Sequence, residues 1–170
     1  MRSKKQVHQD FTQSTQKLLS ALNEFPEDHF QSSGPNGGWS AAEIAEHIIK
    51  SEAGLVKFFG EDAESTERDP EQKIELMKEK MLNFQQKFSA PSQVEPNDGP
   101  KDRQQLIDKL QDIRQRIAGM IEIEDLTKLL TVFGHPGFGT LTRVEWLYFN
   151  IYHAERHVEQ VEDLKKHLVS

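Results

Sequence analysis

The sequence predicts an all-α fold, a bundle of four long helices with one extra helical segment packed alongside. Apolar residues recur at spacings of three and four in five separate stretches, which is the period of a buried helix face. No stretch alternates polar and apolar residues over the length of a strand, so strands are expected to be few or absent. The length of 170 residues, without a linker or repeat, indicates a single domain over residues 1–170.

The first two helices are expected over residues 5–25 and 41–59, on either side of the glycine- and proline-rich loop "SSGPNGG". The second has a complete start signal. Ser40 is the predicted N-cap, and Glu43 three residues later completes a capping box, in which each side chain bonds the other residue's backbone N–H. The apolar positions of the two stripes are Phe11, Leu18, Leu22 and Phe25, then Ile44, Ile48, Leu55 and Phe58.

The remaining helices are expected over residues 71–88, 102–122 and 143–167. The first of these ends before the proline-rich stretch "SAPSQVEPNDGP". The last repeats the start signal of the second helix, with Thr142 as N-cap and Glu145 three residues later. The apolar stripes are Ile74, Met77, Met81, Phe84 and Phe88 in the first segment, and Leu106, Leu110, Ile113, Ile117 and Met120 in the second.

Composition excludes several classes of protein. The formal net charge is -7 and no basic stripe is present, which argues against a partner made of nucleic acid. No apolar run approaches the ~20 residues that cross a bilayer, so no membrane association is expected. No apolar segment follows the charged N-terminus as in a secretory signal, so cytoplasm is the expected compartment. The chain has no cysteine, so any metal must bind histidine, aspartate or glutamate.

The stretch "NIYHAERHVEQ" carries His153 and His157, four residues apart in the last predicted helix. A helix advances 100° per residue, so the two rings lie about 40° apart, on the face that also holds Trp146 and Asn150. This face points into the bundle, where an unpaired imidazole costs free energy. A shared metal would satisfy both rings, and hydrogen bonding within the core is the alternative.

A third ligand is expected from the apolar face of another helix, and His47 in the 41–59 helix meets this condition. The other histidines lie at chain ends or outside the helices, and His135 is expected to have a turn or cap role; they are His8, His29, His135 and His167. Three neutral imidazoles with water completing the coordination shell are typical of an open catalytic site, not a closed structural one.

Two familiar metal sites are excluded by spacing. "HAERH" is not the H-E-x-x-H pattern of metalloproteases, because Glu155 lies two residues after His153 and points away from the rings. Di-iron bundles need Glu-x-x-His pairs, and no glutamate lies three residues before a candidate histidine. Asn150, Glu46 and Ser51 are candidate supporting or substrate groups, although each also suits an ordinary helix position. No general base is identified.

Two segments resemble the DinB-like (DinB/YfiT) superfamily. "GGWSAAEIAEHI" at 37–48 is similar to the start of that family's second helix, and "HPGFGTLTRVEWLYFNIYHAERHVEQ" at 135–160 is similar to its last helix and the preceding loop. The resemblance runs in order across nearly the whole chain. It implies up-down-down-up topology, a divalent metal (zinc or nickel) on His47, His153 and His157, and a homodimer. It also implies metal-dependent hydrolysis or the transfer of a small thiol.

Two classes of function therefore stay open. In the first, the protein is a metal-dependent hydrolase or thiol (S-) transferase that acts on a small-molecule substrate such as a thiol. In the second, it is a non-catalytic, metal-stabilised bundle that works through association, in stress response or as a dimeric module. Under this second hypothesis the aromatic residues Trp39, Trp146, Tyr148 and Tyr152 would form the dimer surface instead of core or pocket.

Overall fold

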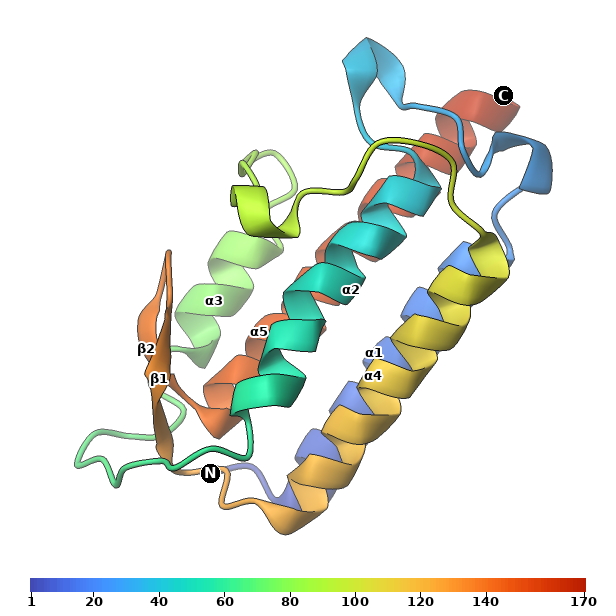
Figure 1. The fold of residues 1–170 in the computed structure, drawn as a ribbon. Helices are drawn as coiled ribbons and strands as arrows, with labels where there is room; N and C mark the ends of the chain where they lie inside the picture. The colour runs from blue at the N-terminus through green and yellow to red at the C-terminus, as the bar shows by residue number, and fades with distance from the viewer.

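The structure, a computed structural model that describes residues 1–170, consists of five α-helices and one β-hairpin (Figure 1). The helices are α1 (Lys4–Asn23), α2 (Ala41–Phe58), α3 (Ile74–Met81), α4 (Arg103–Ile123) and α5 (Arg143–Val169). The strands are β1 (Leu129–His135) and β2 (Gly139–Thr142). The predicted all-α class and the four long helices are confirmed. No helix combines the length and the apolar character needed to span a membrane.

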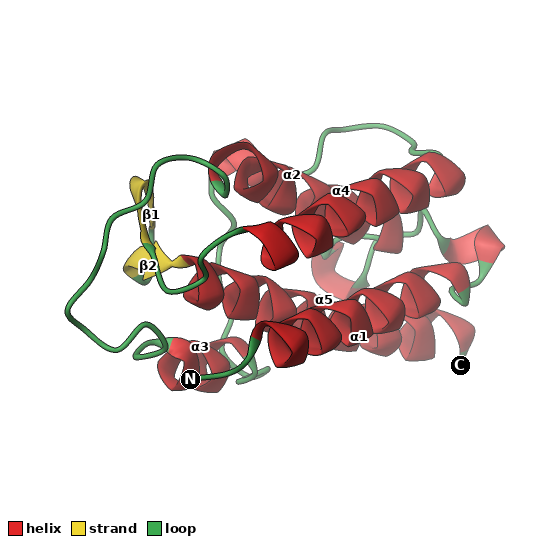
Figure 2. Ribbon diagram, turned by 90° about the horizontal axis from the view of Figure 1, so that it is seen from below, coloured by secondary structure: helices red, strands yellow, loops and turns green.

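Helices α1, α2, α4 and α5 form the bundle. Figure 1 shows α1 and α5 running in one direction and α2 and α4 in the other, so the order along the chain is up-down-down-up. Helix α1 packs against α4 and α5, and α2 packs against the same two helices from the other side. The short helix α3 lies against α5. Figure 2 shows the hairpin at the end of the bundle where α5 begins.

Both predicted capping boxes are present. The Ser40 hydroxyl accepts the Glu43 N–H, and the Glu43 carboxylate accepts the Ser40 N–H at 2.8 Å. Thr142 and Glu145 make the same reciprocal pair at the start of α5, at 3.2 and 2.9 Å. These boxes fix the first turns of the two helices that carry the candidate metal ligands.

The predicted helix over 71–88 was too long at both ends. Helix α3 begins at Ile74 and ends at Met81, and the side chains of Phe84 and Phe88 are 49% and 50% exposed instead of buried. The guanidinium of Arg156 on α5 bonds the carbonyl oxygens of Met81, Asn83 and Gln86. Arg156 thus binds carbonyl oxygens at the last residue of α3 and just beyond it, where the helix ends.

The small hairpin is the one regular element that the helical period did not locate. Strands β1 and β2 are antiparallel, with Leu130 opposite Leu141 and Leu129 opposite Thr142, and the register is irregular beyond Leu130. Only Leu130 of β1 is buried. A strand with a single buried side chain has no alternating pattern for sequence analysis to detect.

The core consists of two apolar clusters with a polar layer between them. One cluster lies toward the hairpin end and includes Phe11, Leu55 and Ile117, and the other includes Leu18 and Ile48. The polar layer comprises Ser14, Glu52, Arg114 and His153, all buried. The candidate histidine site therefore lies at mid-height in the bundle, against this layer.

Candidate metal centre

The structure brings together the three histidines that the sequence singled out. The Nε2 atom of His153 lies 3.1 Å from Nε2 of His47 and 3.0 Å from Nε2 of His157. One ring nitrogen from each of the three lies within 4.8 Å of the others. Bonds of about 2.0–2.1 Å to a tetrahedral zinc ion place two ligand nitrogens about 3.3 Å apart. The two spacings from His153, 3.0 and 3.1 Å, are therefore close to those between the ligands of a zinc ion.

The partners of the other ring nitrogens fix the tautomers of two rings. Nδ1 of His47 donates to the backbone carbonyl of Val94 at 2.9 Å, and Nδ1 of His157 donates to the side-chain oxygen of Gln160 at 2.8 Å. Because the protons are on Nδ1, both Nε2 atoms present bare lone pairs toward Nε2 of His153.

Hydrogen bonds among the three imidazole rings cannot satisfy all of their facing nitrogen atoms. His153 Nε2 faces two bare nitrogens, and a neutral imidazole carries only one N–H, so at least one contact brings two lone pairs together. Nδ1 of His153 is buried without a hydrogen-bond partner in the protein. A cation between the three Nε2 atoms would turn the repulsion into ligation, so the residues fit a divalent metal with imidazole ligands.

Burial keeps the three rings neutral. Relative exposures are 5% for His47, 8% for His153 and 7% for His157. Burial lowers the pKa of His157 to about 3, and it lowers the pKa of His47 as well. Burial, followed by the neighbouring His157 and His47, holds the pKa of His153 well below its usual range. Neutral imidazole is the form that binds metals, so the site is ready for a cation at physiological pH.

Aromatic rings line two sides of the site. The indole of Trp39 lies 4.9 Å from the His47 ring, and the Phe149 ring stacks on His153 at 5.4 Å with an interplanar angle of 14°. His135 lies behind Phe149, 4.3 Å away from it, and burial lowers its pKa to about 4. Its Nδ1 accepts the N–H of Gly137, which is the predicted turn role.

The candidate supporting residues Asn150 and Ser51 are engaged in their own helices. The Asn150 side chain donates to the carbonyl of Trp146, and the Ser51 hydroxyl donates to the carbonyl of His47. Neither contacts a ring nitrogen of the three histidines. Glu46 instead contacts the segment after η3 (Ser92–Val94), where its carboxylate accepts from Asn97.

The residues that do contact the ring nitrogens were missed from the sequence. Gln160 lies three residues after His157, and this spacing on one helix was a usable signal. The acceptor for Nδ1 of His47 is the backbone carbonyl of Val94, in an irregular connection, and no sequence pattern predicts a backbone acceptor. The ion pair of Glu52 and Arg114, 2.5 Å apart with neither side chain exposed, was missed as well.

Three of the four aromatic residues proposed for a dimer surface are in the core, which corrects that expectation. Trp146, Tyr148 and Tyr152 are 5%, 4% and 7% exposed, and only Trp39 is partly exposed. Tyr148 donates its hydroxyl to Asp10 of α1. Helix α5 packs against α1, α2 and α3, so these three side chains are covered by neighbouring elements and are not free to meet a partner.

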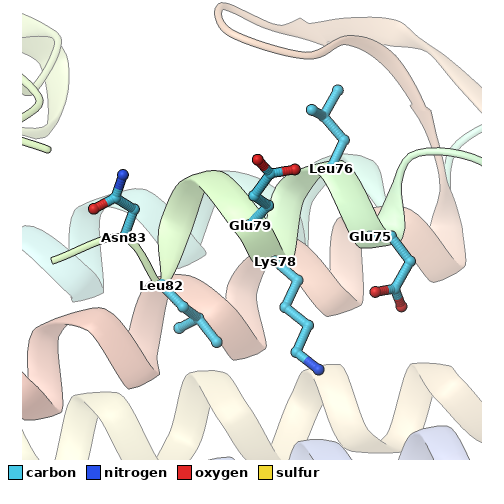
Figure 3. Close-up of a pocket in the computed structure, with 6 residues that line it drawn as sticks. All are labelled: Glu75, Leu76, Lys78, Glu79, Leu82 and Asn83. Atoms are coloured by element: carbon cyan, nitrogen blue, oxygen red, sulfur yellow. The ribbon is translucent and has the colours of Figure 1, made fainter.

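A surface hollow of about 600 Å³ runs along α3 (Figure 3). Its lining side chains are Glu75, Leu76, Lys78, Glu79, Leu82 and Asn83. None of the three histidines lines it. The hollow is open to solvent and holds none of the candidate ligands, so the candidate centre is the buried histidine cluster and not this surface feature.

Comparison with known proteins places this geometry in context. The family model of the DinB superfamily matches residues 10–161. The uncharacterised protein YuaE of Bacillus subtilis is 28% identical over 135 residues, which is 75% of this chain and 78% of that protein. The structure of YfiT from Bacillus subtilis, described as "a probable metal-dependent hydrolase with an unusual four-helix bundle topology", superposes with a TM-score of 0.62 at 14% identity. The alignment covers 99% of this chain and 90% of YfiT.

Proposed function

This chain belongs to the DinB superfamily, and from that premise we propose that it is a metal-dependent enzyme acting on a small molecule. The metal is divalent, zinc or nickel, and its ligands are His47, His153 and His157. The reaction is hydrolysis or the transfer of a small thiol. The observation that carries the proposal is the convergence of three Nε2 atoms, two of them with their lone pairs exposed to the third.

Three protein ligands leave a fourth position for a water or a thiolate cosubstrate, which is the arrangement of catalytic zinc sites. When bound, the metal supplies Lewis-acid activation of that fourth ligand. The chain's own residues hold the site in shape. Val94 and Gln160 accept from the Nδ1 atoms of His47 and His157, which orients both rings, and Phe149 covers one face of His153.

The buried carboxylates are not available as general bases. Glu52 is held by Arg114, and Glu145 accepts two hydrogen bonds from Arg68, at 2.7 and 2.6 Å, as well as its capping bond. This arrangement favours a reaction that needs no protein carboxylate, such as attack by a thiolate or by water that the metal has already activated.

A second candidate function is a metal-stabilised bundle without catalysis, acting in stress response or as a dimeric module. The observation in its favour is that each of the three histidines is less than one tenth exposed, which leaves little ring surface for a substrate. The oligomeric state in either case is proposed to be a homodimer.

The experiment compares metal-loaded and chelator-treated protein, purified without a His-tag, in two assays. One assay follows hydrolysis of ester and amide substrates, and the other follows transfer of small thiols to an electrophile. Wild type is measured beside His47→Ala, His153→Ala and His157→Ala, with His167→Ala as the control because His167 is exposed at the end of α5.

The proposal expects one tightly bound divalent ion in wild type and in His167→Ala, strongly weakened binding in each of the other three variants, and activity only with metal. Tight metal binding without turnover in either assay would favour the second candidate function. If His47→Ala binds metal as tightly as wild type, the proposed ligand set is wrong.

A further inference from the structure

One segment between α3 and α4 contacts the candidate metal centre directly. The backbone carbonyl of Val94, in the short helix η3 (Ser92–Val94), accepts from Nδ1 of His47 at 2.9 Å. Figure 1 shows this part of the chain crossing close to α2. The segment has little regular structure of its own, and residues 95 and 97–100 are exposed, so its position depends on contacts with the bundle.

Helix α2 supplies those contacts through two residues that flank His47. The Lys50 ammonium donates to the carbonyl of Glu95 at 2.6 Å and to the side-chain oxygen of Asn97 at 2.9 Å. The Glu46 carboxylate accepts the backbone N–H of Asn97 at 3.0 Å and its side-chain amide at 3.2 Å. Asn97 is therefore held by a cation and an anion that lie one turn apart on the same helix.

Lys101 closes this arrangement. Its ammonium lies 3.2 Å from the Glu46 carboxylate and donates to the carbonyls of Asn97 and Gly99, at 2.6 and 2.9 Å. We call the four residues Glu46, Lys50, Asn97 and Lys101 the Asn97 clamp. The contacts made by Lys50 begin one residue after Val94, so the clamp restricts where the Val94 carbonyl can lie relative to His47.

We propose that Glu46 and Lys50 are positioning residues of the metal centre: through the Asn97 clamp they hold the Val94 carbonyl on Nδ1 of His47, and they thereby slow the release of the metal. This inference rests on the proposed function, because it takes His47 as a ligand. The physical reason is that an acceptor on Nδ1 fixes the tautomer, aims Nε2 at the metal and raises its basicity.

The Asn97 clamp should affect the rate of metal release without contributing much to the stability of the fold. The bonds of Lys50 and Asn97, which the test variants remove, lie at the protein surface, where individual polar contacts of this kind contribute about 0–1 kcal/mol to stability. The Glu46–Lys101 pair is more covered, with side chains 17% and 9% exposed, and it is left in place. Loss of a partner on a ligand's other ring nitrogen, by contrast, costs about 10–100-fold in metal affinity or activity. A change in the clamp should therefore alter metal release much more than it alters the unfolding of the metal-free protein.

The test uses the full chain loaded with Zn²⁺, and it follows transfer of Zn²⁺ to an excess of a chromophoric chelator. The variants are Lys50→Met and Asn97→Ala, with Lys50→Arg as the conservative change that retains a donor. Lys57→Met is the matched control, because it removes the same charge from an exposed position of the same helix outside the clamp.

We expect the Zn²⁺ release rate to rise about tenfold in Lys50→Met and in Asn97→Ala, the lower end of the range for such partners, and to stay within twofold of wild type in Lys50→Arg and Lys57→Met. The double variant Lys50→Met, Asn97→Ala should release Zn²⁺ no faster than the more affected of the two single variants, because both changes disrupt the same clamp. Unfolding midpoints of the metal-free proteins should coincide within error.

A second readout does not need a metal. Long-range ¹H–¹⁵N spectra of the metal-free protein report the tautomer of His47, which should be the Nδ1–H form in wild type and a mixture in Lys50→Met. Equal release rates and unchanged tautomers in the two clamp variants would overturn the inference. If wild type bound no Zn²⁺, the proposed function would fail, whereas the tautomer measurement would still decide whether the clamp orients His47.

Discussion

The Arg114 guanidinium and the Glu52 carboxylate form an ion pair at the centre of the bundle, where neither side chain reaches solvent. Arg114 Nη1 also donates to the hydroxyls of Ser14 and Thr15, at 3.2 and 3.1 Å, so the pair joins α1, α2 and α4. Burial raises the pKa of Glu52, and Arg114 opposes that shift.

We expect Arg114→Met to destabilise the fold by about 3–5 kcal/mol, because it leaves the Glu52 carboxylate buried without its counter-charge. The double variant Arg114→Met, Glu52→Leu should recover most of that loss, since it removes both charges at nearly constant volume. Urea denaturation of the two single variants and the double variant measures the coupling. Additive losses would show that the two residues do not act as a pair.

Substitution of the two N-cap residues should destabilise the fold less than Arg114→Met does, and by different amounts. Ser40→Ala should destabilise by about 1 kcal/mol through loss of the bond to the Glu43 N–H. Thr142→Ala should cost more, because the Thr142 hydroxyl also donates to the carbonyl of Pro70 at 2.7 Å, a bond that Ser40 lacks. Ser89→Ala, at an exposed position, is the control. Equal unfolding midpoints for all three variants and wild type would contradict the assignment of these caps.

The stability of the metal-free protein should fall as the pH drops below about 6.5, the pKa of histidine in an unfolded chain. Burial lowers the folded-state pKa of His157 to about 3 and that of His135 to about 4, so at pH 5 the unfolded chain binds protons that the folded chain does not. Stability then rises with pH, by about 1.4 kcal/mol per pH unit for each such histidine.

Urea denaturation at pH 5 and at pH 7.5, with a chelator present, measures this slope. His135→Gln removes one of the titrating groups without touching the proposed ligands, so its slope should be smaller than that of wild type. A slope that His135→Gln leaves unchanged would mean that the folded protein does not hold the half-buried His135 ring in its neutral form.

Metal should stabilise the folded protein by mass action. At a free Zn²⁺ concentration of 100 times Kd, the expected gain is about 2.7 kcal/mol. The gain should vanish in His47→Ala and should fade as the pH falls below about 6, because protons compete with the metal for imidazole. Calorimetric scans with and without Zn²⁺ measure it. A gain of equal size in His47→Ala would show that the stabilising ion binds elsewhere.

The proposed homodimer should sediment at twice the chain mass of 19.6 kDa at micromolar concentration. Since Trp146, Tyr148 and Tyr152 of α5 are buried, the exposed apolar side chains of the hairpin are the better surface for a dimer, with Val132 63% and Phe133 47% exposed. Val132→Lys should shift the equilibrium toward the monomer. A single species of 19.6 kDa in wild type would rule out the dimer at that concentration.

Sequence analysis predicted the features that follow from local rules. The helix starts at Ser40 and Thr142 and the shared face of His153 and His157 depend on residues within one or two turns of each other. It failed for features that depend on contacts between residues far apart in the chain. Helix α3 ends at Met81, where Arg156 of α5 binds the carbonyls of Met81 and Asn83, and the Nδ1 partner of His47 is a backbone oxygen in an irregular connection. The pairing of Glu52 with Arg114 spans 62 residues, and charge patterns along the chain do not reveal it.

The position of the candidate ligands along the chain has a consequence for the unfolded state. His47 and His153 are 106 residues apart, and their rings meet at one point. An ion held by both would close a loop that contains most of the polypeptide, as a disulfide does, in a protein that has no cysteine. In the chain-entropy account, a permanent cross-link over about 100 residues is worth about 4.7 kcal/mol. Residual binding to unfolded histidines would give the denatured protein a metal-dependent compactness, visible as a smaller urea m-value with Zn²⁺ than with a chelator.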